Sequence, residues 1–222
     1  MDIFKSITDN VPRVKTTDTL SAILDMMDDA KLTHLPIVDD GKLVGWLSET
    51  HILDIDDDNL TAQRIALHED VPAVVSDQPL TTVISTMHIF TTDVVPIIDK
   101  KNNYLGCCTA QTVVESLADS LGANASGKVV AMRFNTIDYS LTRVVDIVES
   151  NDAKIYSITT NLINSNDTVE VFVKLNIQEV SAIISSLARY GIEAWELGAT
   201  SESNSVLMRN YNSLMQYLKI DN

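Results

Sequence analysis

The stretch Pro36-Ile37-Val38-Asp39 returns sixty residues later as Pro96-Ile97-Ile98-Asp99, and this internal repeat decides the fold of the first half of the chain. Val11-Pro12-Arg13-Val14 returns at the same offset as Val71-Pro72-Ala73-Val74. Single positions agree as well: Leu20 with Leu80, Met27 with Met87 and, after one inserted residue, Gly45 with Gly106 and Ser48 with Thr109. Two copies of one supersecondary unit usually bury their apolar faces on each other. The sequence therefore predicts two docked copies, with a cleft between them in which a small ligand would sit.

Each copy is predicted to run strand, helix, hairpin and helix. The first helix of each copy carries apolar residues at i, i+3, i+4 and i+7, namely Leu20, Ile23, Leu24 and Met27, and then Leu80, Val83, Ile84 and Met87. The hairpins are expected over 35–38 with 43–47 and over 94–98 with 104–108, and Asp40-Gly41 suits the first turn. Asp18 is predicted to cap the first helix, and Pro79 is predicted to lie in the first turn of its equivalent.

The composition of the chain limits the classes of function that are possible. The 222 residues carry a formal net charge of −15, which repels nucleic acid and anionic membrane surfaces. No apolar run approaches the roughly 18 residues that span a bilayer, and residues 1–6 have no signal-peptide core. We therefore expect a cytoplasmic protein that binds neither nucleic acid nor membrane. The only cysteines, Cys107 and Cys108, are adjacent and should point to opposite faces of a strand, which predicts buried, inert thiols and no metal site.

The order of elements, together with Leu35-Pro36-Ile37-Val38-Asp39 and Gly45-Trp46-Leu47-Ser48, resembles the CBS domain, named after cystathionine β-synthase. The resemblance covers both repeats, so residues 1–122 are expected to form a CBS domain pair with copies at about 1–60 and 61–122. CBS domains occur as tandem pairs that pack into one pseudo-symmetric module. Many such pairs bind adenosine-containing ligands and regulate an attached or partner protein, and the resemblance implies such a role here.

The ligand motif of that family ends in an aspartate whose carboxylate accepts both ribose hydroxyls. It runs glycine, two apolar residues, Ser or Thr, two variable residues and then the aspartate. The matching segments here are residues 45–51 and 106–112. They imply Ser48, His51, Thr109 and Thr112 as residues of an adenosine-nucleotide site, with His51 and Thr112 at the aspartate positions. The alternative is that Ser48 and Thr109 only cap the helices that follow them.

The second half of the chain has a different pattern. A linker is predicted over 123–127, followed by a strand, helix, two strands, helix and strand over 128–198. Asn176 and Glu179 predict a capping-box start for the second helix, and Gly191 predicts its end. This βαββαβ order is ferredoxin-like. The expected fold class is therefore α/β of the α+β kind, a tandem CBS-domain pair followed by a ferredoxin-like domain.

With Tyr139-Ser140-Leu141-Thr142-Arg143-Val144 at the start of its first helix, the segment 128–198 looks like an ACT domain, the small regulatory module of amino-acid metabolism. ACT domains dimerise edge to edge and hold an amino acid near the first strand–helix loop. The resemblance implies three candidate ligand residues in this loop, Asn135, Asp138 and Tyr139. The loop lacks the glycine that lets a backbone approach a ligand. Asp138 could meet an ammonium group, or it could be a helix-cap carboxylate.

Residues 199–222 predict a tail helix that packs on its own domain or on a second subunit. The chain has no Gly-rich phosphate loop, nucleophile elbow or HExxH motif, so we expect no catalysis, no metal and no firmly assigned cofactor. Two hypotheses remain. One is a regulatory homodimer that senses a metabolite, either an adenosine nucleotide or an amino acid. The other is a dimerisation and docking scaffold for a partner protein, with no small-molecule ligand.

Overall fold

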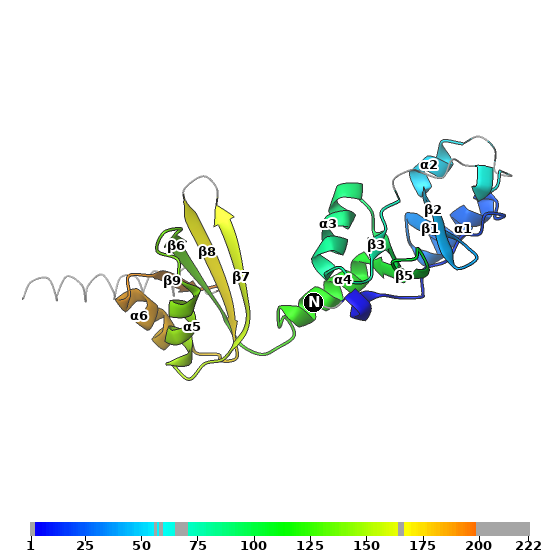
Figure 1. Ribbon diagram of the computed structural model, residues 1–222. Helices are drawn as coiled ribbons and strands as arrows, with labels where there is room; N and C mark the ends of the chain where they lie inside the picture. Colours follow the sequence, from blue (N-terminus) through cyan, green and yellow to red (C-terminus); the bar gives the residue numbers. More distant parts are fainter. Residues whose placement is uncertain (1–2, 56, 58–59, 65–70, 164–166, 199–222) are drawn as a thin grey trace, which may run out of the picture. The chain divides into compact units, whose positions relative to one another are not determined.

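The computed structural model describes residues 3–55, 57, 60–64, 71–163 and 167–198 (Figure 1). The chain divides into two compact units, Met1–Ala118 and Asp119–Asn222. The predicted tail helix over 199–222 lies outside the described residues. Among the helices of the described part, none is long and apolar enough to cross a bilayer.

The first copy of the repeat contains α1 (Leu20–Ala30), the hairpin β1 (His34–Asp39) and β2 (Lys42–Ser48), and the short helix α2 (Glu49–Leu53). The predicted cap of α1 at Asp18 is wrong. Thr19 is the N-cap, and its hydroxyl accepts from the Ala22 N–H at 3.4 Å. The Asp18 carboxylate is engaged one turn earlier, where it accepts from the Lys15 N–H at 2.8 Å.

The second copy contains β3 (Val74–Val75), α3 (Leu80–Phe90), β4 (Val94–Ile98), β5 (Tyr104–Thr109) and α4 (Ala110–Ser120). Pro79 has extended backbone angles and is the N-cap of α3, not the first-turn residue that the sequence predicts. The two hairpins share a local irregularity, because the register shifts between Ile37 and Val38 in one and between Ile97 and Ile98 in the other. The sequence repeat is therefore a backbone repeat, down to the position of a β-bulge.

Each hydrophobic core of the first unit contains residues from both copies of the repeat. The core of the first copy, around Leu20 and Trp46, includes Val94 and Cys107 of the second copy. The core of the second copy, around Leu80, includes Ile3 and Cys108. The neighbouring cysteines thus enter different cores, as strand alternation predicts, and burial raises the pKa of each thiol to about 12. The expectation of buried thiols is confirmed.

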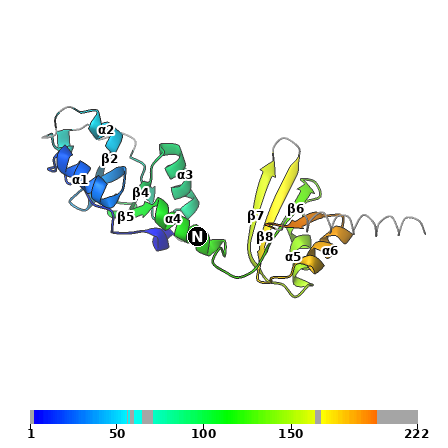
Figure 2. The ribbon, with the colours of Figure 1, turned by 180° about the vertical axis from the view of Figure 1, so that it is seen from behind.

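The second unit contains six regular elements within its described residues: β6 (Val129–Asn135), α5 (Leu141–Glu149), β7 (Ile155–Ile163), β8 (Thr168–Leu175), α6 (Ser181–Arg189) and β9 (Glu193–Glu196). The sheet order is β7-β8-β6-β9, with every neighbouring pair antiparallel. Both helices cover one face of the sheet (Figures 1 and 2), where Val144 of α5 and Leu187 of α6 are fully buried. This topology confirms the ferredoxin-like prediction.

The start of α6 differs from the prediction. The helix begins at Ser181, after the N-cap Val180, and the capping box from Asn176 to Glu179 does not form. The Asn176 side chain instead accepts from the Lys154 N–H at 2.7 Å, and the Ile177 carbonyl accepts from the Lys128 N–H at 3.0 Å. Because these contacts tie the segment to neighbouring chain, the helix starts about one turn later. Gly191, with φ of +74°, ends α6 as predicted.

Candidate functional site

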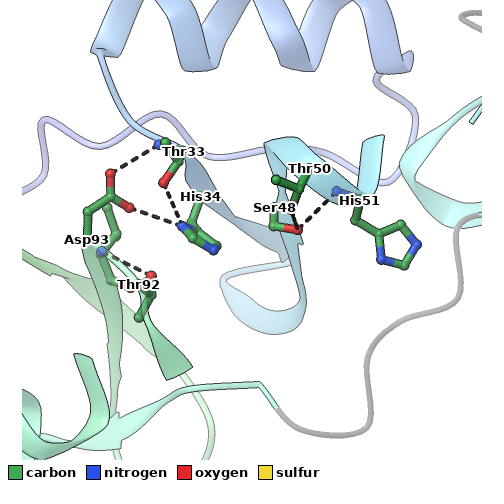
Figure 3. Close-up of polar contacts among 8 residues, drawn as sticks. Thr33, His34, Ser48, Thr50, His51, Thr92 and Asp93 are labelled. Carbon is green, nitrogen blue, oxygen red and sulfur yellow. Dashed lines mark hydrogen bonds and ion pairs between the residues drawn. The ribbon is translucent and has the colours of Figure 1, made fainter. Parts of the chain in front are cut away.

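The two repeats meet at the starts of β1 and β4. The Thr33 N–H donates to Asp93 Oδ2 at 3.1 Å, and His34 Nδ1 lies 3.1 Å from Asp93 Oδ1 (Figure 3). A carboxylate can only accept a hydrogen bond, so this contact places a proton on Nδ1. We call Thr33, His34 and Asp93 the inter-repeat joint. Thr33 and Asp93 are equivalent positions of the repeat, sixty residues apart.

Each side of the joint is tied to the helix that follows its hairpin. The Thr33 carbonyl accepts from the Glu49 N–H at the start of α2, and the Asp93 carbonyl accepts from the Ala110 N–H at the start of α4, both at 2.8 Å. The same backbone contact is thus made once in each copy. A backbone shift at the start of α2 or α4 would therefore act on Thr33 or Asp93 through one hydrogen bond.

Ser48 and Thr109 lie beside the joint, at the ends of β2 and β5. In the hairpin registers Ser48 is opposite His34, and Thr109 is opposite Val94. Ser48 Oγ accepts from the His51 N–H at 3.2 Å, and Thr109 Oγ1 accepts from the Thr112 N–H at 3.2 Å. Both hydroxyls therefore cap the helices that follow, as the alternative interpretation proposed. Their role in ligand binding stays a prediction.

His51 and Thr112, at the two aspartate positions of the motif, are placed differently. The Thr112 hydroxyl accepts from the Thr109 N–H at 3.0 Å and donates to the Thr109 carbonyl at 3.1 Å, so its hydrogen-bonding groups are engaged at the helix start. The His51 ring points away from the inter-repeat joint (Figure 3). Neither position supplies the anionic acceptor that two ribose hydroxyls require.

The joint is half-buried, which shapes its electrostatics. The side chains of His34 and Asp93 are 16% and 31% exposed, and the His34 ring stacks on Trp46 with centroids 5.3 Å apart. Burial of the Asp93 carboxylate raises its pKa, but hydrogen bonds from His34 and Thr33 outweigh that effect. The pKa of Asp93 therefore lies below its ordinary value of 3.8.

Replacing Asp93 by asparagine is expected to lower the free energy of unfolding of the first unit by about 1 kcal/mol at neutral pH, because the charged acceptor of the joint is lost. A lowered carboxylate pKa contributes stability above the unfolded-state value, and that stability is lost as the pH falls through the folded-state value. The difference in unfolding free energy between the native protein and Asp93→Asn should therefore become smaller as the pH falls below 3.8, the ordinary pKa of the carboxyl group. Urea unfolding across a pH series measures it.

Asp28 provides a matched control for this prediction. It pairs with Lys31 on the surface of α1, with side chains 83% and 78% exposed. Because an exposed pair contributes little, Asp28→Asn should leave the stability unchanged. An equal loss from both substitutions would contradict a specific role for the joint.

In the second unit, two of the three predicted loop residues come together. Asn135 and Asp138 line a hollow of about 420 Å³ that Arg133 and Glu193 also line. Tyr139 instead packs against the core, with its ring edge-on to Phe134 at 5.6 Å. The alternative role of Asp138 as the helix cap is wrong, because the N-cap of α5 is Ser140, whose hydroxyl accepts from the Arg143 N–H at 3.4 Å.

Sequence reasoning missed the inter-repeat joint. His34 shares no metal-ligand spacing with another histidine, and spacing along the chain was the wrong test for it. The useful signal was the repeat offset, since Thr33 and Asp93 occupy equivalent positions and pseudo-symmetric copies bring equivalent positions together. No group of three or more His, Cys, Asp or Glu residues that could hold a metal occurs among the residues that the structure describes.

Comparison with known proteins finds a match for the first copy of the repeat. Residues 2–58 match the family model of the CBS domain. No curated protein sequence matches the chain. Among solved structures, a CBS domain pair/ACT domain protein from Thermotoga maritima is 18% identical, with 55% of this chain and 99% of that chain covered and a TM-score of 0.49.

Two further solved structures are similar at the same level. The CBS domains of a transcriptional regulator from Streptococcus pneumoniae are 18% identical, with 52% of this chain and 98% of that chain covered and a TM-score of 0.46. A CBS domain pair in complex with 5′-methylthioadenosine and S-adenosyl-L-methionine is 20% identical, with 53% and 96% covered and a TM-score of 0.45. The family comparison thus shows a similarity to the CBS domain over residues 2–58, in the first copy of the repeat.

Proposed function

We propose that the protein is a non-catalytic, cytoplasmic regulatory module of the CBS-pair type that senses a small metabolite and signals through a homodimer. The observation that carries this proposal is the inter-repeat joint. Ser48 lies opposite His34 of the joint, and Asp93 is bonded to the start of α4. A ligand bound beside either helix start would lie close to a polar contact between the two copies.

The ligand class we propose is an adenosine-containing nucleotide. Ser48 and Thr109 keep the hydroxyl of the motif in both copies, whereas the missing carboxylates would leave ribose hydroxyls without an ionised acceptor. An unpaired buried hydroxyl costs about 1–3 kcal/mol. We therefore expect weak binding, supported by stacking and backbone contacts. Binding in the second copy would also compete with the Thr112 hydrogen bonds to Thr109.

Ligand binding is tested by thermal shift on the full chain with AMP, ADP, ATP, S-adenosylmethionine, NADH and the twenty amino acids. A ligand at a hundred times its Kd stabilises by about 2.7 kcal/mol, which corresponds to roughly 5–10 °C for a chain of this size. We expect the adenosine compounds to raise the melting temperature, and the double variant His51→Asp, Thr112→Asp to enlarge that rise. No response in either protein to any adenosine compound would refute the nucleotide site.

An amino acid is the second candidate ligand, favoured by one observation. The carboxylate of Asp138 and the amide of Asn135 line the same hollow of about 420 Å³, within the range of small-ligand sites. Asp138 would then meet the ammonium group of the ligand. A melting shift from one amino acid that Asp138→Asn abolishes would support this site, and a shift that survives Asp138→Asn would exclude it.

The scaffold hypothesis makes the opposite prediction. A dimerisation and docking scaffold would form a stable dimer by analytical ultracentrifugation and would respond to no small molecule in the panel. A monomer at micromolar concentration would contradict signalling through a homodimer and would contradict the scaffold as well.

A further inference from the structure

The outer surface of the two helices of the second unit is hollowed. The hollow has a volume of about 620 Å³, within the range of small-molecule sites. Its walls come from α5 and from the end of α6, so it lies on the helical side of the sheet. Its lining includes Arg143, Asp146, Ser150 and Asn151 from α5 and the turn after it, and Ser186 and Arg189 from α6.

Within the part of the chain that the structure describes, neither arginine of this hollow forms an ion pair. The described part of the second unit holds six Lys and Arg residues. Three of them, Lys128, Arg133 and Lys154, form ion pairs with glutamates, and Lys174 donates to the Gly127 carbonyl. The remaining two are Arg143 and Arg189, which form no ion pair among the residues that the structure describes, and both line this hollow. In a chain of net charge −15, two guanidinium groups that line one hollow, with no ion pair to any described residue, would favour an anionic ligand there.

The floor of the hollow orients one of these cations without neutralising it. Ser186 is only 6% exposed, and its hydroxyl accepts from Arg189 at 2.8 Å. The Asn151 amide donates to the Ile147 carbonyl at 2.8 Å and lies 3.4 Å from the same hydroxyl. A guanidinium has five N–H donors, so a single bond to a neutral hydroxyl leaves Arg189 positioned, charged and able to bind an anion.

The other polar side chains that line the hollow have a different chemistry. Asp146 adds one carboxylate, and Ser150 and Asn151 add neutral polar groups. A carboxylate repels an anion but accepts hydrogen bonds from hydroxyl groups. Moreover, the hollow is larger than a bare phosphate requires. The lining therefore fits a ligand that has an anionic end and a hydroxyl-rich body.

We propose that the hollow between α5 and α6 binds a sugar phosphate, with the phosphate on Arg143 and Arg189 and the sugar hydroxyls toward Asp146, Ser150 and Asn151. Guanidinium groups match phosphate oxygens in geometry as well as charge. This site is separate from the nucleotide site proposed in the first unit. It shares Arg143 with the loop hollow that Asp138 lines, but it depends on Arg189 and not on Asp138.

The test is an NMR titration of the full-length, ¹⁵N-labelled protein with ribose 5-phosphate, glucose 6-phosphate, ribose and inorganic phosphate. We expect saturable shifts of the resonances of α5 and α6, with at least one sugar phosphate binding more tightly than inorganic phosphate or ribose. Arg143→Gln and Arg189→Gln should each weaken binding at least about tenfold.

Lys154→Gln is the matched control, because it removes the same charge from the same unit at a surface ion pair whose side chains are 69% and 54% exposed. We expect native affinity from this variant and a native spectrum from every variant before titration. Absence of saturable shifts at millimolar ligand would overturn the proposal. Equal weakening by Lys154→Gln would overturn it too, since it would show general electrostatic attraction. Equal affinity for inorganic phosphate and both sugar phosphates would exclude the sugar contacts.

Discussion

Replacing Gly127 by alanine is expected to unfold the second unit under conditions in which the native unit is folded. Gly127 has φ of +141°, and a Cβ atom there would overlap the Leu175 carbonyl oxygen. That oxygen is backbone, so no side-chain rotation can relieve the clash. The strands cannot separate cheaply either, because the Leu175 N–H donates to the Lys128 carbonyl at 2.8 Å. We expect a loss of about 4 kcal/mol or more in the free energy of unfolding.

The measurement can separate the two units, because the chain has two tryptophans, Trp46 in the first unit and Trp195 in the second. In a Trp46→Phe background, Trp195 fluorescence reports urea unfolding of the second unit alone. Gly191→Ala is the matched control, since Gly191 has φ of +74° with nothing within 4 Å of an added Cβ. Gly191→Ala should lower the free energy of unfolding by about 1 kcal/mol, because alanine is strained in a left-handed backbone conformation. Equal losses from the two variants would show that the steric argument is mistaken.

Leu20→Ala and Leu80→Ala are each expected to lower the free energy of unfolding of the first unit by about 2–5 kcal/mol. These leucines are equivalent in the repeat, and their side chains are 1% and 0% exposed. Each belongs to a core that also contains residues of the other copy's sequence region, such as Val94 in the first core and Ile3 in the second. Because neither core is complete within one copy, both copies should unfold in a single transition.

Trp46 reports this coupling, because it belongs to the core of the first copy. In a Trp195→Phe background, Leu80→Ala in the second copy should move the Trp46 unfolding midpoint to lower urea concentration, as Leu20→Ala does. Leu53→Ala, at a side chain that is 65% exposed, should change the stability by less than about 0.5 kcal/mol. A Trp46 midpoint that does not respond to Leu80→Ala would mean that the copies unfold independently.

Most regular elements could be predicted from sequence because the relevant signals are local. Apolar spacing located α1 and α3, and the offset of sixty residues located the second copy from the first. The residues at which helices begin were harder to predict. Asp18 and Asn176 have side chains suited to capping, but each is engaged by another backbone N–H, that of Lys15 or that of Lys154. Since several acceptors near a helix start compete for the same few N–H groups, packing decides which of them caps the helix.

The sequence by itself determined the repeat, the order of elements in both halves, and the family resemblance that led to Ser48 and Thr109. Tertiary structure alone decided which polar side chains connect the two copies. It also decided which cationic side chains without an ion pair to a described residue line the same hollow. The joint links residues about sixty positions apart, and the hollow of the second unit brings together Arg143 and Arg189 from different helices. Hydrophobic periodicity specifies which face of an element is buried. It carries no information about which polar side chains meet, because those contacts depend on how the buried faces dock.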